Sequence, residues 1–156
     1  SLFPSFQTGF VVAPENLISE AKNYLQMLDR QGDLTQEQML SELIYEGEIH
    51  RLLIKNVLVY KQRRDFLYQC LEENFKNAVH FKKPTGGLAL WLQFNTVISL
   101  VKLSEQALKY DLFLSKTILY QDKNTCAIRL GFGHLNEEEI EIIVKKLKQA
   151  YDCVLN

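Results

Sequence analysis

The chain has 156 residues, of which 47% are apolar and 24% charged, and its formal net charge is -1. These values are those of one ordinary globular domain, and they exclude both a disordered chain and a strongly basic nucleic-acid-binding surface. No apolar run reaches the roughly 20 residues that span a bilayer, so no membrane partner is expected.

The chain opens with a predicted strand followed by a helix. Residues 8–14 form a β-branched and aromatic run that is closed by Pro14, as is typical of a short strand. Pro14 suits the first position of a helix, and the apolar residues from Leu17 to Leu28 keep helical spacing. We therefore expect a helix directly after the strand.

Two further helices are predicted before the middle of the chain. Thr35 is followed by Gln38 three residues later, which is a capping-box pattern, and Gly47 ends the apolar period. A long helical stretch then runs from about Glu48 to Phe75.

The period changes from helix to strand in the second half of the chain. Residues 78–84 alternate, residues 88–94 continue as a mostly buried strand, and the Pro-Thr-Gly-Gly turn between them predicts a hairpin. Residues 99–111 predict a short amphipathic helix, and residues 112–120 contain one short strand.

The last strand and the last helix are the clearest elements. Residues 125–132 are apolar except for one arginine, which predicts a strand. Asn136 then caps a helix whose first turn holds three glutamates, while lysines occupy its later turns, as the helix dipole favours. Helices before and after a small, mainly antiparallel sheet, with one long helix among them, predict an α+β fold.

Arg129 interrupts the last strand and is the candidate binding residue. In a strand it shares one face with the small residues Ala127 and Gly131, while Ile128 and Leu130 face the core. Small neighbours leave room for the guanidinium, whose planar fork of donors suits a carboxylate or phosphate. The alternative is a solvated face with Arg129 paired to an acidic neighbour, and the pattern alone favours this alternative because most arginines are exposed.

Other conspicuous residues are given structural interpretations. Arg63, Arg64 and Asp65 are expected on the solvent side of the long helix, since charged helix faces are the norm. Trp91 lies in an apolar strand and is expected in the core. His134 is expected in a water-exposed loop.

The remaining polar and reactive groups predict no catalytic or metal site. Gly86 and Gly87 are interpreted as turn residues of the hairpin, because no strand-loop-helix phosphate unit surrounds them. The three cysteines, Cys70, Cys126 and Cys153, are far apart and odd in number, which predicts reduced core thiols of a cytoplasmic protein. The three histidines show no metal-ligand spacing with them. No nucleophile, base and orienting group occur together in the pattern.

A series of motifs resembles the C-terminal part of fold-type-I pyridoxal-phosphate enzymes. The motifs are "YKQRRDFLYQCL", "FKKPTGGLALWLQF" and "CAIRLGFGHLNEEEIEIIVKKL", preceded by "ELIYEGEIHRLLIKNVLVYKQRRD" and "SLFPSFQTGFVVAPENL". They are most similar to the aminotransferase-like domains of the MocR branch of GntR-type bacterial regulators. The resemblance extends over nearly the whole chain.

The resemblance implies a domain division and a role for Arg129. In the family, the segment like "SLFPSFQTGF" directly follows the lysine that binds the cofactor covalently, which implies a fragment that lacks this lysine and most of the large domain. Residues 1–14 would then be a strand segment of the missing large domain, and residues 15–156 the C-terminal small domain. Arg129 falls on the arginine that grips the α-carboxylate of an amino-acid ligand.

Two positions depart from the family pattern. Members usually carry an arginine at the position of Gln7, where it contacts the cofactor phosphate, so the neutral Gln7 implies weaker phosphate binding. A Pro-Gly pair is common where this chain has Ser115 and Lys116, which implies a differently shaped loop. Both changes are consistent with a domain that senses a ligand without turning it over.

The leading hypothesis is therefore the C-terminal fragment of the aminotransferase-like effector domain of a MocR/GntR-type transcriptional regulator, not catalytic by itself. The resemblance implies that the intact parent protein binds pyridoxal phosphate and an amino-acid or keto-acid ligand, forms a homodimer, and binds DNA through an N-terminal winged-helix domain. No cofactor is expected in this fragment. One alternative is the C-terminal part of a class I/II aminotransferase, and another is a self-standing interaction domain.

Overall fold

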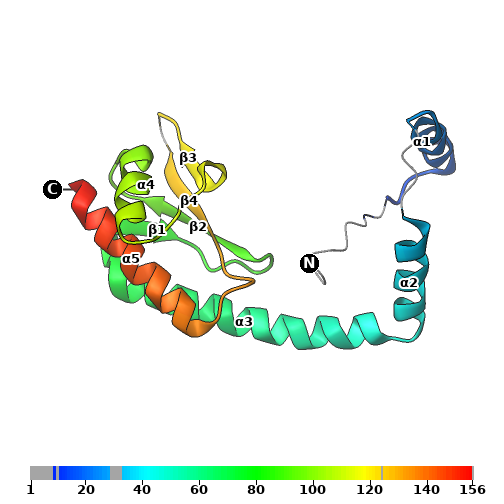
Figure 1. The fold of residues 1–156 in the computed structure, drawn as a ribbon, viewed down its shortest axis with the longest axis horizontal. Coiled ribbons are helices and arrows are strands. Elements are labelled where there is room, and N and C mark those ends of the chain that lie inside the picture. Colours follow the sequence, from blue (N-terminus) through cyan, green and yellow to red (C-terminus); the bar gives the residue numbers. More distant parts are fainter. Residues whose placement is uncertain (1–8, 10, 29–32, 124, 156) are drawn as a thin grey trace. The chain divides into compact units, whose positions relative to one another are not determined.

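The computed structural model describes residues 9, 11–28, 33–123 and 125–155, which form two compact units. The first unit comprises residues 1–57 and the second residues 58–156. The first holds helices α1 (Glu15–Met27) and α2 (Leu34–Tyr45) (Figure 1). Helix α3 (Glu48–Phe75) begins in the first unit and continues into the second.

The helices of the first unit form where the apolar period predicted them, but one cap differs. Pro14 directly precedes α1 as its N-cap residue, one position before the first helical residue, Glu15. Helix α2 begins one residue before Thr35, because Asp33 is its cap and its carboxylate accepts hydrogen bonds from the backbone N–H groups of Thr35 and Gln36. The prediction that Thr35 caps this helix was wrong, since an aspartate two residues earlier offers a stronger acceptor.

The strand predicted for residues 8–14 is not formed in the described part of this segment. Gly9 and residues 11–14 have no regular secondary structure, and residues 8 and 10 lie outside the described residues. Val11 and Val12 are exposed. A strand needs a partner for its backbone hydrogen-bonding groups, and the described residues supply none here.

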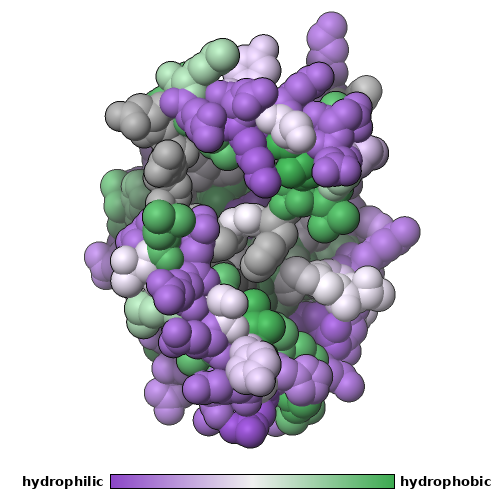
Figure 2. All heavy atoms as spheres, turned by 90° about the vertical axis from the view of Figure 1, so that its right-hand side faces the viewer, coloured by the Kyte–Doolittle hydropathy of each residue, from purple (hydrophilic) through white to green (hydrophobic). Residues whose placement is uncertain are grey.

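Helices α1 and α2 of the first unit leave most of their apolar residues accessible to solvent. Neither α1 nor α2, both fully described, contains a buried residue. Figure 2 shows exposed apolar side chains in green among hydrophilic ones in purple. Leu25, Met39 and Ile44 are among the exposed apolar residues of these two helices. The amphipathic sequences of α1 and α2 therefore form helices that bury none of their own residues.

The second unit is built around a four-stranded antiparallel sheet with the order β1-β2-β4-β3. Its strands are β1 (Val79–Phe81), β2 (Ala89–Phe94), β3 (Leu119–Gln121) and β4 (Cys126–Gly131). The first two form the predicted hairpin, and Gly87 in their turn has a φ of 81°, a conformation that favours glycine. Strand β4 lies between β2 and β3 and pairs with both.

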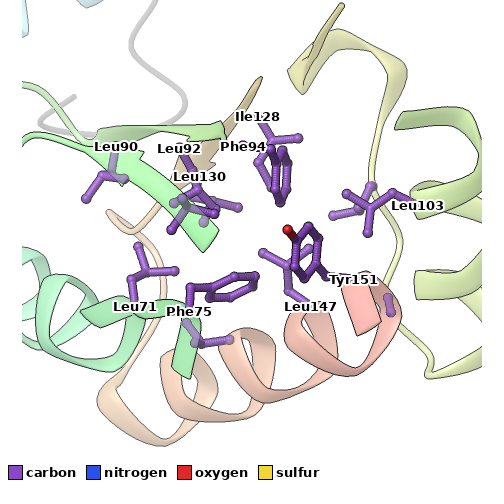
Figure 3. Close-up of a cluster of buried hydrophobic side chains, with 14 of the residues drawn as sticks. Leu71, Phe75, Leu90, Leu92, Phe94, Leu103, Ile128, Leu130, Leu147 and Tyr151 are labelled. Carbon is purple, nitrogen blue, oxygen red and sulfur yellow. The ribbon is translucent and has the colours of Figure 1, made fainter. Parts of the chain in front are cut away.

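Helices cover one face of this sheet. Helix α4 (Leu100–Lys109) follows β2, and α5 (Glu137–Leu155) follows β4, with a short 3₁₀ turn, η1 (Lys76–Ala78), after α3 and another, η2 (Lys116–Ile118), before β3. Side chains of α3, α4 and α5 meet those of the strands in one apolar cluster (Figure 3). The rings of Phe94 and Tyr151 stack within it, with centroids 5.2 Å apart. The α+β prediction is confirmed.

Two arginines join α3 to the loops at one end of the sheet. Arg63 Nη1 donates to the carbonyl oxygen of Gly133 at 2.5 Å, and Arg64 Nη1 donates to that of Pro84 at 3.0 Å. Arg64 also forms an ion pair with Asp65. A second ion pair joins Lys83 Nζ to Oδ1 of the same carboxylate, at 3.0 Å. Arg63, Arg64 and Asp65 are partly buried, so the prediction of a simply solvated charged turn was wrong. The cause is tertiary, because the carbonyl groups come from segments distant in sequence.

Among the described residues, no helix combines the length and the apolar character that crossing a membrane requires.

Arg63 should contribute measurably to stability. Arg63→Ala removes a charged donor from a partly buried carbonyl group, which should lower the free energy of unfolding by about 1.5–3 kcal/mol. Urea denaturation followed by circular dichroism would measure this. Arg51→Ala is the matched control on the same helix, because Arg51 forms only an exposed pair with Glu48, and it should cost below about 0.5 kcal/mol. Equal effects of both substitutions would contradict the anchoring role.

The start of α5 should depend on its capping box. Asn136 Oδ1 accepts from the backbone N–H of Glu139 at 2.9 Å, and Glu139 Oε2 accepts from that of Asn136 at 2.8 Å. Asn136→Ala should lower the free energy of unfolding by about 1 kcal/mol. The control is Glu138→Ala, which removes a first-turn charge but leaves both bonds in place. A neutral Asn136→Ala would show that core packing alone fixes this helix.

Candidate functional site

Arg129 lies on the face of the sheet opposite the helices. Its strand neighbours Ile128 and Leu130 are 0% and 7% exposed, whereas Arg129 is exposed. Within the part of the chain that the structure describes, the guanidinium forms no hydrogen bond and no ion pair. The predicted alternation of buried and exposed residues is therefore confirmed. The acidic partner that the alternative interpretation required is not present among the described residues.

Trp91 shares this face and is the residue that the sequence interpretation misplaced. Trp91 on β2 is the direct cross-strand partner of Arg129 on β4. It is 41% exposed, while its neighbours Leu90 and Leu92 are fully buried. The prediction of a core tryptophan was wrong because the strand alternates, and Leu90 and Leu92 take the inward positions. The alternation in "LALWLQF" was the available signal.

A second aromatic residue, Tyr120, meets Trp91 across the middle strand. Tyr120 lies on β3, and its ring centroid is 4.6 Å from that of Trp91, with an interplanar angle of 53°. Since β4 separates β2 from β3, the two rings meet above β4. Ala127, the cross-strand partner of Tyr120, is 0% exposed although it lies on the outer face. We name this pair of rings the aromatic bridge; sequence reasoning missed it entirely.

The two small residues beside Arg129 thus have different surroundings. The aromatic bridge lies on the Ala127 side, where a larger side chain would separate the rings. Gly131, on the other side, is exposed, and a Cβ atom built there would meet only the carbonyl oxygen of Leu88, at 3.9 Å. On this face Arg129 therefore lies between the strand position of Ala127, which the aromatic bridge covers, and the open position of Gly131.

The other candidate residues do not join this face. His134 is exposed in the loop before α5, as expected, and Gly86 and Gly87 belong to the hairpin turn. Ser115 caps η2, and its hydroxyl lies 2.9 Å from that of Thr117. Gln7 lies outside the described residues, so its expected position near a phosphate stays a prediction.

The cysteines are only partly as predicted. Cys70 and Cys126 are buried, and burial raises the pKa of the Cys70 thiol, which is consistent with an inert group. Cys153 is exposed on α5, with its sulfur 3.3 Å from the hydroxyl of Tyr110, so its assignment to the core was wrong. No cluster of metal-ligating side chains occurs among the residues that the structure describes.

Two groups of proteins resemble the chain in sequence. It is 26% identical over 148 residues to the HTH-type transcriptional regulator NorG of Staphylococcus aureus, covering 94% of this chain and 33% of the regulator. It is 30% identical over 150 residues to an uncharacterized aminotransferase of Saccharolobus solfataricus, covering 94% and 37%. The chain thus spans about a third of the length of these relatives. No protein-family model matches the chain.

Solved structures of aminotransferases share the fold. An archaeal alanine:glyoxylate aminotransferase superposes with a TM-score of 0.83 at 22% identity, over 95% of this chain and 37% of the enzyme. The α-aminoadipate aminotransferase LysN of Thermus thermophilus, solved with N-(5'-phosphopyridoxyl)-L-leucine, gives 0.76 at 22% identity, over 93% and 37%. The fold and the sequence relatives agree: the chain has the fold of the C-terminal domain of fold-type-I aminotransferases, and its homologues are HTH-type regulators and aminotransferases.

Proposed function

We propose that this chain belongs to the effector domain of a MocR/GntR-type transcriptional regulator and that Arg129 binds the carboxylate of an amino-acid or keto-acid ligand there. One observation carries the proposal: Arg129 is an exposed guanidinium without a hydrogen-bonding or ionic partner among the described residues, on the face of the sheet opposite the helices of its unit. A permanent cation in such a position can bind a ligand anion without first breaking an internal ion pair.

The chemistry of the face suits a single carboxylate. Arginine presents its donors in a planar fork that matches the two oxygens of a carboxylate. Arg129 is held by β4, whose neighbours pair with it on both sides, so its backbone position is fixed. Gly131 leaves space for the ligand to approach. The sheet would orient the guanidinium, while the charge of Arg129 would supply most of the affinity for the carboxylate.

The same face does not fit a phosphate group. Phosphates are bound by helix N-termini, by turns of several backbone N–H groups or by several cations. The described strand residues of this face instead offer one guanidinium, the imidazole of His80, the amide of Gln93 and two aromatic rings. We therefore place pyridoxal phosphate, which would act as an electron sink, on the remainder of the parent protein. The described residues of this domain would bind the amino-acid ligand and not the cofactor.

The regulator is favoured over an enzyme by the resemblance to the MocR branch and by the relation to NorG. The aminotransferase of S. solfataricus supports the second candidate, the C-terminal part of a class I/II aminotransferase. In the first case the parent protein would be a cytoplasmic homodimer that binds DNA through a separate winged-helix domain. Residues 1–14 would pair with the large domain of that parent, and residues 15–156 would form its small domain.

Arg129 should control the affinity for carboxylates. In calorimetric titrations of the full-length protein with L-alanine in the presence of pyridoxal phosphate, Arg129→Gln should weaken binding by about 10-fold or more, because it removes a charge-assisted pair. Arg129→Lys should recover only part of the affinity, since lysine lacks the fork. L-alaninamide, which lacks the carboxylate, should not distinguish the variants. Arg51→Gln is the control; an unchanged affinity of Arg129→Gln would overturn the proposal.

DNA binding and amino-group transfer should separate the two candidate parents. We expect the full-length protein to retard DNA from upstream of its own gene and the isolated chain not to, because the chain has a net charge of -1 and no basic surface pattern. Gel retardation measures the first property, and keto-acid formation from L-alanine and 2-oxoglutarate measures amino transfer. Multiple turnovers without DNA binding would establish the enzyme instead.

A further inference from the structure

We propose that the aromatic bridge of Trp91 and Tyr120 is a selectivity wall, that is, a surface that contacts the side chain of the ligand. It would make Arg129 bind preferentially those carboxylates that carry a planar aromatic side chain. This inference rests on the proposed function, because it assumes that the ligand is held at Arg129. It adds the chemical class of the ligand, which neither the sequence motifs nor the names of the two sequence relatives specify.

The register of the sheet places the wall beside the cation. Trp91 is the direct cross-strand partner of Arg129, and such partners have Cβ atoms about 4.5–5.5 Å apart. Tyr120 is the partner of Ala127, two positions before Arg129 on the same strand and the same face. A ligand whose carboxylate lies on Arg129 therefore has the aromatic bridge within reach of its side chain.

The bridge is accessible, although aromatic residues of a strand usually contribute to a core. Trp91 is 41% and Tyr120 37% exposed, whereas the large side chains on the inner face are almost fully buried. The rings are held against each other by the strands on either side of β4, so little conformational freedom remains to be lost when a ligand binds. Offset or tilted contacts between aromatic rings are favourable beyond the apolar area that they bury.

Charge complementarity argues for a small anionic ligand on this face. A purely apolar partner would cover Arg129 and leave its charge without a counterion, which is unfavourable. An aromatic amino acid or its keto acid supplies both a carboxylate for Arg129 and a ring for the bridge. Aliphatic ligands such as alanine would use the cation and leave the rings in contact with water.

The test compares L-phenylalanine with L-alanine on the full-length protein with pyridoxal phosphate present. Calorimetry should show tighter binding of L-phenylalanine, and Trp91→Leu should weaken it about 3- to 10-fold while changing the affinity for L-alanine less than about 2-fold. Tyr120→Leu should act in the same direction. L-phenylalanine should also change the tryptophan fluorescence of the full-length protein, and Trp91→Leu should remove that change, because Trp91 is the one tryptophan of this chain. Phe113→Leu, at an exposed aromatic residue elsewhere in the same unit, is the matched control.

The variants distinguish this inference from the function on which it rests. If Arg129→Gln weakens both amino acids but Trp91→Leu leaves their affinity ratio unchanged, carboxylate binding stands and the selectivity wall is wrong. If Arg129→Gln weakens neither, or no probe binds, both proposals fail. Lower thermal stability of Trp91→Leu and Tyr120→Leu with an unchanged ratio would show that the contact between the rings only stabilises the sheet, which also overturns the inference.

Discussion

Burial of one face of the four-stranded sheet is the constraint on which the second unit depends. Leu90, Leu92, Ile128 and Leu130 all point to the side covered by α3 and α5, and they meet Leu71 and Leu147 there (Figure 3). Because successive residues of a strand alternate, this choice assigns every other side chain to the opposite face. A shift of register by one residue would bury Arg129 and expose the core, so stability and the position of the candidate site have the same origin.

The uncovered face owes its chemistry to the order of the strands. Strand β4 lies between β2 and β3, although it is the last of the four in sequence. This arrangement puts Arg129 opposite Trp91 and allows Tyr120 to reach Trp91 above Ala127. The small size of Ala127 is required for that contact, whereas Gly131 keeps the opposite side open. A cation beside a fixed aromatic surface is a suitable arrangement for an aromatic carboxylate.

Polar contacts at the end of the sheet connect the long helix to this site. Arg63 binds the carbonyl group of Gly133, which closely follows β4, and Arg64 binds that of Pro84, which precedes β2. The two strands that carry Arg129 and Trp91 are thereby attached to one helix. The thiol of Cys70 lies in the same helix but is buried and has a raised pKa, so its position is explained by packing.

The sequence by itself determined the helices, the hairpin and the two faces of β4, because these depend on periodicity and on residues close along the chain. Helix α3 has the bounds that its pattern predicted, and Arg129 lies on the side that alternation required. Only the tertiary structure decided the surroundings of Trp91, the contacts of Arg63 and the exposure of Cys153. Each of these three features depends on contacts between segments that are distant in sequence. The residues of a single strand or helix do not specify which other segments become its neighbours.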